Sequence, residues 1–243
     1  MRYGIFSDVH SNSEALLACL GALRDAGCER FVCLGDIVGY GAEPNLCVDI
    51  VRDVAAVTVI GNHDAAVVGI LDPSHAHRAA QQAFAYSRRS LSADNFNWLQ
   101  SLSYVHHEDN ICFCHGSPVD AENFDYVFNL DQAATLNERY DTLSDLTFIG
   151  HSHLTTAFLV TKRLALQVNS PRFQIRAGTK YVMNVGSVGQ PRDRDKRACC
   201  VVYVTEDEAV TYLRVEYDIA SAAQKIVDAD LPPAFATRLL EGL

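Results

Sequence analysis

The sequence predicts an α/β protein whose helices cover sheets that are at least partly parallel. Two observations lead to this prediction. The first 60 residues alternate between short apolar runs typical of strands and longer segments with helical spacing. From residue 147 onward strand-type runs predominate, and two helical segments close the chain. With 243 residues, 49% of them hydrophobic, and no internal repeat, we expect one domain over residues 1–243.

The N-terminal segments follow the order strand, helix, strand, helix, strand. The first helix opens with a capping box of Ser11 and Glu14, and Gly27 ends it. Pro44 suits the first turn of the second helix. We therefore expect strands at residues 3–6, 31–34 and 56–60, helices at 15–26 and 44–54, and a glycine-rich loop at 35–41.

Residues 65–102 form a helical insertion rich in Ala and Gln. Helical spacing covers residues 79–91 and 96–102, with Ser92 as an N-cap between them. The segment directly follows a cluster of polar residues, so it either caps a site there or packs against the sheets; the sequence leaves both open. Further strands are expected at 104–107, 111–114, 147–149, 157–161, 164–168, 173–176, 181–185, 200–205 and 210–215, and helices at 218–227 and 233–240.

Composition excludes several classes of protein. Thirty acidic and twenty basic residues give a net charge of −10, which disfavours long nucleic acids and anionic membranes as partners. No apolar run approaches the roughly 20 residues that span a bilayer, and no secretory signal is visible, so we expect a cytoplasmic protein. The eight cysteines include no Cys-x-x-Cys pair, and we expect them to be small buried hydrophobes.

Metal-ligand residue types follow five of the predicted strands, each beside a glycine or at a sharp turn. Because the carboxyl ends of strands form the ligand-binding edge of an α/β sheet, we expect these side chains to meet. Imidazole and carboxylate donors suit a pair of transition-metal ions, which can hold a hydroxide and stabilise in-line displacement at phosphorus. Each motif alone is also typical of a turn, but their joint occurrence after strands favours a metal site. The residues are Asp8, His10, Asp36, Asn62, His63, Asp64, His115, His151 and His153.

The sequence resembles the calcineurin-like metallophosphoesterase superfamily. The resemblance rests on Asp8-x-His10, Gly35-Asp36, Gly61-Asn-His-Asp64, His115 and Gly150-His-x-His153, in the family's order. The segment 184–193 is similar to the Asn-Pro-Gly-Ser segment of the small bacterial and archaeal phosphodiesterase-like branch, with Val185 in place of proline. The resemblance implies a four-layer α/β/β/α sandwich with the site at one sheet edge.

The resemblance also implies a role for each residue. Asp8, His10, Asp36 and His153 bind a first divalent ion, and Asp36, Asn62, His115 and His151 bind a second. A hydroxide that bridges the two ions attacks phosphorus in line. His63 contacts the phosphoryl or leaving-group oxygen as a general acid or a charge stabiliser, and Asp64 orients His63. Mn is the expected metal, with Fe, Zn, Co or Ni as alternatives.

Departures from related branches narrow the expected substrate. Tyr40 stands where the protein Ser/Thr phosphatases and symmetrical dinucleotide polyphosphatases carry a phosphate-gripping arginine. A phosphodiesterase of small substrates remains, with phosphomonoesters or asymmetrical cleavage of dinucleotide polyphosphates as narrower alternatives. Arg192 is the candidate substrate-binding residue. A non-catalytic metal-binding scaffold or interaction protein of the same fold is the competing function, and the oligomeric state stays open.

Four other histidines and a charged loop are interpreted as structural. His75 and His77 suit the entry of a helix, and His106 and His107 lie on opposite faces of a strand at the surface. Arg194, Lys196 and Arg197 alternate with Asp193 and Asp195, which predicts a solvated hairpin whose charges pair with one another.

Overall fold

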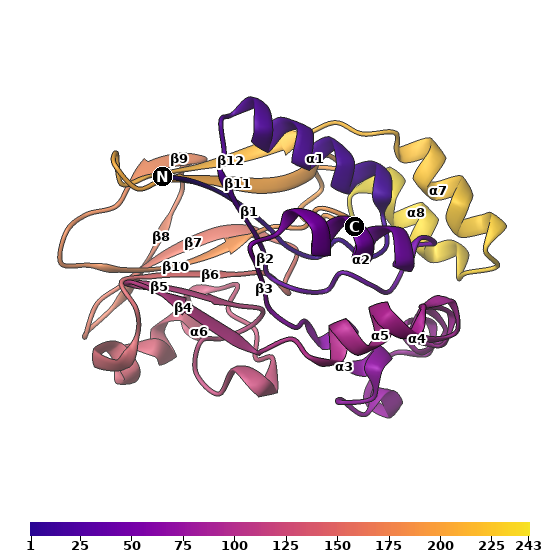
Figure 1. Ribbon diagram of the computed structural model, residues 1–243. Helices are drawn as coiled ribbons and strands as arrows, with labels where there is room; N and C mark the ends of the chain where they lie inside the picture. The colour runs from indigo at the N-terminus through magenta and orange to yellow at the C-terminus, as the bar shows by residue number, and fades with distance from the viewer.

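The computed structural model describes residues 1–243 as two mixed sheets stacked face to face, with helices on both outer faces (Figure 1). The α/β sandwich expected from the sequence is therefore confirmed. The first sheet has the order β3 (Val57–Thr58), β2 (Arg30–Cys33), β1 (Arg2–Phe6), β11 (Ala198–Val204), β12 (Ala209–Val215) and β9 (Arg172–Gln174). The second has the order β4 (Val105–Glu108), β5 (Ile111–Cys114), β6 (Leu146–Ile149), β10 (Lys180–Val185), β7 (Thr155–Val160) and β8 (Ala165–Val168).

Each sheet has a parallel part and an antiparallel part. Strands β1, β2 and β3 run parallel, as do β5, β6 and β10, and the other pairs are antiparallel. The register pairs Phe6 with Cys33 and Phe113 with Phe148, so neighbouring strands end at the same level. The residues after β1, β2, β3, β5 and β6 are therefore delivered to one edge of the sandwich.

The alternation of side chains along the strands builds the layers. Tyr3 and Ile5 of β1 lie between the sheets with Phe113, Phe148 and Met183 of the opposite sheet. Phe6 points to the other face and packs under α1 (Ser13–Asp25) and α2 (Pro44–Val54). Burying such a side chain contributes about 1.5–3 kcal/mol, so the core between the sheets fixes their relative position. All eight cysteines are buried and free.

The remaining helices lie in two groups. On the side of the first sheet are α3 (Asn62–Val68), α4 (Arg78–Ser90), α5 (Ala93–Gln100), α7 (Ile219–Asp228) and α8 (Pro233–Glu241); α6 (Leu130–Thr135) packs on the second sheet. Three short 3₁₀ segments are η1 (Pro73–His75), η2 (Ala121–Asn123) and η3 (Leu136–Thr142). None of the helices combines the length and hydropathy needed to cross a membrane.

Two local expectations are wrong, and two helices were not expected. The N-cap of α1 is Asn12, whose side chain accepts from the Ala15 N–H at 3.1 Å, because the backbone of Ser11 is left-handed (φ 55°) and its N–H bonds Ile37 O instead. Helix α3, which begins at Asn62, and helix α6 had not been expected. The strand expected at 56–60 shortens to β3, since the Ile60 N–H pairs with Ser103 O outside the sheet.

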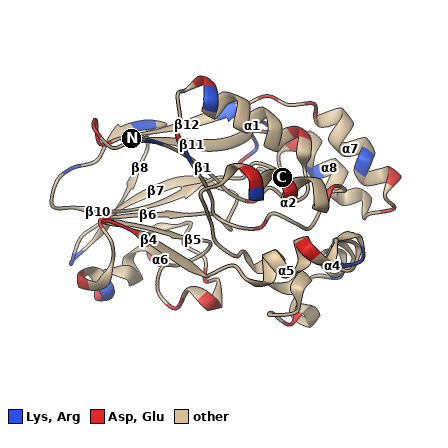
Figure 2. Ribbon diagram, in the orientation of Figure 1, with Lys and Arg blue, Asp and Glu red and all other residues tan.

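The expected self-paired loop after β10 is partly wrong. Arg197 pairs with Asp195 within the loop at 2.6 Å. Asp193 instead pairs with Arg214 of β12, because the loop folds back over that strand. Figure 2 shows Lys and Arg dispersed among Asp and Glu over the helices and loops.

Candidate metal centre

The nine predicted site residues other than Arg192 gather at one edge of the sandwich, and eight of them are buried. Three sets of three have ligand atoms within 4.8 Å of one another. Asp8, His10 and His153 form the first set, and Asp36, His115 and His151 form the second. His10, Asp36 and His63 form a third set that overlaps both. Asn62, which is half-buried, places its Oδ1 3.2 Å from His115 Nε2 and joins the second set. The structure thus brings together residues from five different strand ends.

The backbone at these residues is unusual. Asp8, His10, Asp36, His151 and His153 all have left-handed backbones, with φ between 48° and 71°. Such conformations cost about 1–3 kcal/mol each for residues with a side chain and cluster at functional sites. The neighbouring glycines are required for the same packing, because a Cβ on Gly61 or Gly150 would overlap the carboxylate of Asp36 or Asp8.

In both Asp8 and Asp36, one carboxylate oxygen accepts a backbone hydrogen bond and the other faces the centre. Asp8 Oδ2 accepts from the His151 N–H at 3.0 Å, and Asp36 Oδ1 accepts from the His63 N–H at 2.7 Å. Asp36 Oδ2 lies 3.3 Å from His115 Nε2 and 3.8 Å from His10 Nε2, between the two sets. Asp8 Oδ1 is buried and accepts no hydrogen bond, which is costly unless a cation is present.

Three of the imidazoles are held in the same way. The Nδ1 atoms of His10, His115 and His153 lie 3.2, 2.7 and 2.5 Å from the carbonyl oxygens of Val38, Leu34 and Gln190. Each Nδ1–H therefore donates to the backbone, which leaves the Nε2 lone pair facing the centre. The Nε2 atoms of His10 and His153 are only 3.0 Å apart, and two facing lone pairs repel unless a cation attracts both. This donor set fits divalent transition metals.

Electrostatics keep both carboxylates charged. Burial by itself would raise the pKa of Asp8, but the nearby His153 and His115 outweigh burial and lower it. The pKa of Asp36 is likewise lowered against the effect of burial, chiefly by His115 and His63. Burial lowers the pKa of His151 to about 3. Burial would lower the pKa of His115, but Asp36 and Asp8 outweigh it and raise this pKa to about 9. The centre therefore combines negative oxygens with neutral rings at His10 and His151, while His115 releases a proton when a metal binds.

His63 lies beside the two sets on the first turn of α3. Its ring packs against His10, Tyr40 and Phe84, with centroids 4.6, 4.5 and 4.8 Å away. Burial lowers its pKa to about 4, and its buried Nδ1 has no hydrogen-bond partner. The ring is thus fixed by packing, with its polar atoms unused.

The Asp64 carboxylate bonds to backbone N–H groups and not to the His63 ring, so it can orient His63 only through the backbone of α3. Asp64 Oδ1 accepts from the N–H groups of Ile37 and Val38 at 2.9 and 3.1 Å, and Oδ2 accepts from Gly61 at 3.2 Å. The carboxylate therefore ties the loop that carries Asp36 to the start of α3. Burial and the charge of Asp36 raise the pKa of Asp64 to about 7.

Arg192 lies beside the centre but outside both sets. Its Nη2 donates to the Tyr40 hydroxyl at 3.2 Å and to Gln190 Oε1 at 3.1 Å. Its Nε is buried without a partner. The other four histidines lie outside the centre: His77 caps α4, His75 ends η1, and His106 and His107 belong to β4.

Several supporting residues were not among the predicted site residues. Ser187 Oγ donates to Asp8 O at 2.9 Å and accepts from the Gln190 N–H at 2.9 Å, and Asn184 Nδ2 donates to Ser152 Oγ at 2.7 Å. Both belong to the 184–193 segment that the resemblance singled out. Tyr126 stacks on His151 with centroids 3.8 Å apart, and no motif pointed to it.

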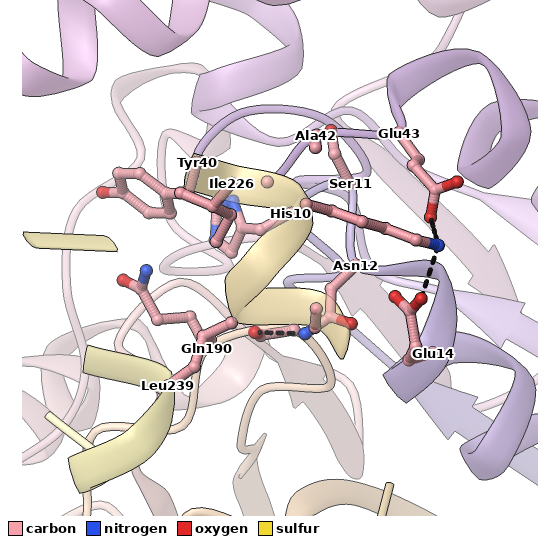
Figure 3. A pocket seen from close by; sticks show the side chains of 14 residues that line it. His10, Ser11, Asn12, Glu14, Tyr40, Ala42, Glu43, Gln190, Ile226 and Leu239 are labelled. Carbon is pink, nitrogen blue, oxygen red and sulfur yellow. Dashed lines mark hydrogen bonds and ion pairs between the residues drawn. The ribbon is translucent and has the colours of Figure 1, made fainter. Parts of the chain in front are cut away.

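A small cavity lies behind His10, lined by Tyr40, Asn12, Gln190, Ile226 and Leu239 (Figure 3). Its volume of about 10 Å³ is that of one water molecule, too small for a substrate. At its edge Lys225 of α7 bridges Glu14 and Glu43 at 2.5 and 2.6 Å, which joins the C-terminal helices to α1 and α2.

Comparisons with known proteins agree with this geometry. The sequence model of the calcineurin-like phosphoesterase superfamily domain matches residues 1–207. An uncharacterized protein of Methanocaldococcus jannaschii is 35% identical over 98% of this chain and 97% of its own. The crystal structure of a metallophosphoesterase from Sphaerobacter thermophilus superposes with a TM-score of 0.84 at 34% identity, covering 100% of this chain and 99% of that one.

A hypothetical protein from Pyrococcus horikoshii OT3 has the same fold at 17% identity, with a TM-score of 0.80 and coverage of 100% of this chain and 98% of that one. One conclusion follows from the extent of the family match, from the full-length relatives and from the cluster of His and Asp residues. The chain belongs to the calcineurin-like phosphoesterase superfamily, whose members are metal-dependent hydrolases.

Proposed function

We propose that the protein is a phosphodiesterase of small substrates that works with two divalent transition-metal ions. Asp8, His10, Asp36 and His153 hold the first ion. Asp36, Asn62, His115 and His151 hold the second, and Asp36 bridges the two. The observation that carries the proposal is the position of Asp36 Oδ2, within 4 Å of a ring nitrogen from each set.

The donor chemistry supports Mn as the metal. The ligands are imidazoles, carboxylates and one amide oxygen, with no thiolate among them. Carboxylate and amide oxygens favour Mn, while imidazole also suits Zn, Fe, Co and Ni. The proposal therefore names Mn first and leaves the other ions to the metal analysis.

When bound, the two ions supply a nucleophile derived from water and neutralise charge on the phosphoryl oxygens during in-line displacement. Burial lowers the pKa of His63, so its ring is neutral in the free protein; the negative phosphate raises this pKa on binding, and the ring then donates its proton toward the leaving-group oxygen of the ester. Arg192, with its unpaired Nε, binds a non-bridging phosphate oxygen. Asp64 keeps the Asp36 loop and α3 in register so that Asp36 and His63 stay adjacent.

Small substrates are favoured by the surroundings of the centre. Phe84 of α4 packs edge-on against His63, so we extend the proposal to residues 65–102 as a cap that forms one wall of the site. The net charge of −10 disfavours long nucleic acids. The chemistry also accommodates phosphomonoesters and dinucleotide polyphosphates, which belong in the substrate assay.

The test is metal analysis followed by hydrolysis. The purified protein is analysed for Mn, Fe, Zn, Co and Ni, then loaded with Mn²⁺ and assayed on bis-p-nitrophenyl phosphate, p-nitrophenyl phosphate and a dinucleotide polyphosphate. We expect two ions per chain and faster turnover of the diester. His115→Ala should lose activity, whereas His107→Ala, at the exposed position of strand β4, should not. Two bound ions without turnover of any ester would point to a metal-binding scaffold instead.

A further inference from the structure

His151 differs from the other three histidines of the centre in how its ring is held. The rings of His10, His115 and His153 are each fixed by an Nδ1–H bond to a backbone carbonyl. The His151 ring makes no hydrogen bond; only its backbone N–H is used, toward Asp8. Something other than a hydrogen bond must therefore fix the direction of its ring nitrogens.

The ring of Tyr126 packs against the His151 ring and can fix its direction. It lies nearly parallel to the His151 ring, with an interplanar angle of 14° and centroids 3.8 Å apart. Stacked aromatic pairs contribute about 0.5–1.5 kcal/mol beyond their buried area, enough to select one ring orientation. Tyr126 is still 45% exposed, so burying its own ring in the core does not explain its position.

The backbone around Tyr126 is anchored on both sides. Phe124 and Val127 are buried, and Asp125 O accepts from the Ser117 N–H at 2.8 Å. Gly116 makes this approach possible, because a Cβ there would lie 2.8 Å from Asp125 O and 3.0 Å from the backbone of Phe124. The segment is thus pinned to the loop after β5, the loop that carries His115.

We propose that Tyr126 is a positioning residue for His151 and thereby sets the affinity of the second metal ion. Its ring does for His151 what a backbone carbonyl does for each of the other three histidines. The proposal rests on the proposed ligand role of His151. Groups that orient metal ligands typically contribute about 10- to 100-fold to metal affinity, and we expect an effect of that size on one ion only.

The experiment is a calorimetric titration of the metal-free protein with Mn²⁺, followed by electron paramagnetic resonance of the Mn²⁺ pair. Tyr126→Leu should raise the Kd of one of the two ions about 10- to 100-fold, leave the Kd of the other unchanged and reduce the signal of the coupled pair. Tyr126→Phe keeps the stacking ring and should bind both ions as the wild type does. Tyr140→Leu, which removes a half-buried tyrosine of η3 whose ring contacts Lys162 and Lys180, is the matched control.

Gly116→Ala is a second variant that leaves the tyrosine in place. The added methyl group displaces the backbone of residues 124–125, so the second ion should again bind more weakly while the first is retained. Equal affinity for both ions in Tyr126→Leu and wild type would overturn the inference. Equal weakening of both ions would also overturn it, because it would indicate a general structural role. A wild-type protein that binds fewer than two ions would instead refute the proposed two-metal function, and the role of Tyr126 with it.

Discussion

Two regions of the candidate centre differ in how their side chains are held. The inner group, defined as Asp8, His10, Asp36, His115 and His153, is at most 2% exposed, and backbone groups fix each side chain. The outer group, defined as Tyr40, Tyr126 and Arg192, is held by ring contacts and side-chain hydrogen bonds and reaches solvent. His63 lies between them.

This difference indicates that the inner group suits metal binding and the outer group suits substrate binding. Ligands of a metal must be held to within tenths of an ångström, and backbone hydrogen bonds in a buried site provide that. Groups that contact a substrate have to tolerate its entry and exit. We therefore expect changes in the inner group to remove metal and activity together, and changes in the outer group to alter substrate binding with the metals retained, apart from Tyr126.

The largest effect is expected from Asp36→Asn. The substitution removes the charge that both ions share, so we expect loss of both metals and a fall in kcat/KM of more than roughly 1,000-fold, since removing even one charge-stabilising group costs about 100- to 1,000-fold. Elemental analysis and diester hydrolysis measure both quantities. Retention of two ions with near-normal turnover would remove Asp36 from the ligand set.

His63→Asn tests the residue that lies between the inner and the outer group. Loss of a proton donor should lower kcat by about 100-fold or more while two ions stay bound, because the inner group is untouched. The fall in kcat should be smaller for a p-nitrophenyl ester than for an alkyl ester, because a good leaving group needs less protonation. An equal drop for both esters would contradict the donor role.

Arg192→Met tests the outer group. The guanidinium should contribute a charged hydrogen bond of about 1.5–3 kcal/mol to the phosphate, so KM should rise about 10- to 100-fold with little change in kcat or metal content. Arg197→Met, in the same loop but paired with Asp195, is the matched control. A fall in metal content in Arg192→Met would place the residue with the inner group.

The smallest effect on activity is expected from Ser187→Ala. The change leaves the Gln190 N–H without its partner and Asp8 O with only the Gly189 N–H, and it should cost about 1–3 kcal/mol in the free energy of unfolding. Denaturant unfolding of the metal-free protein measures this. A large loss of activity at unchanged stability would show that Ser187 contributes to the chemistry directly.

Much of the fold and of the site could be predicted because the signals are local. Apolar runs and glycines locate β1, β2 and β5 within one or two residues, and the ligand types directly follow these strands. The exceptions also have local causes. The N-cap of α1 moved from Ser11 to Asn12 because Ser11 is tied to Ile37, a contact that no spacing reveals.

The chain by itself therefore determined the strand ends, the residue types of the ligands and the family, since each depends on neighbours in sequence. Only the tertiary structure decided which neighbouring residues hold those ligands in their orientation. Asp64 serves the backbone of residues 37 and 38 and not the His63 ring. Tyr126 meets His151, 25 residues further along the chain, only because β5 and β6 lie side by side and Gly116 lets the intervening segment approach. Such contacts depend on packing between distant segments, and no local pattern encodes them.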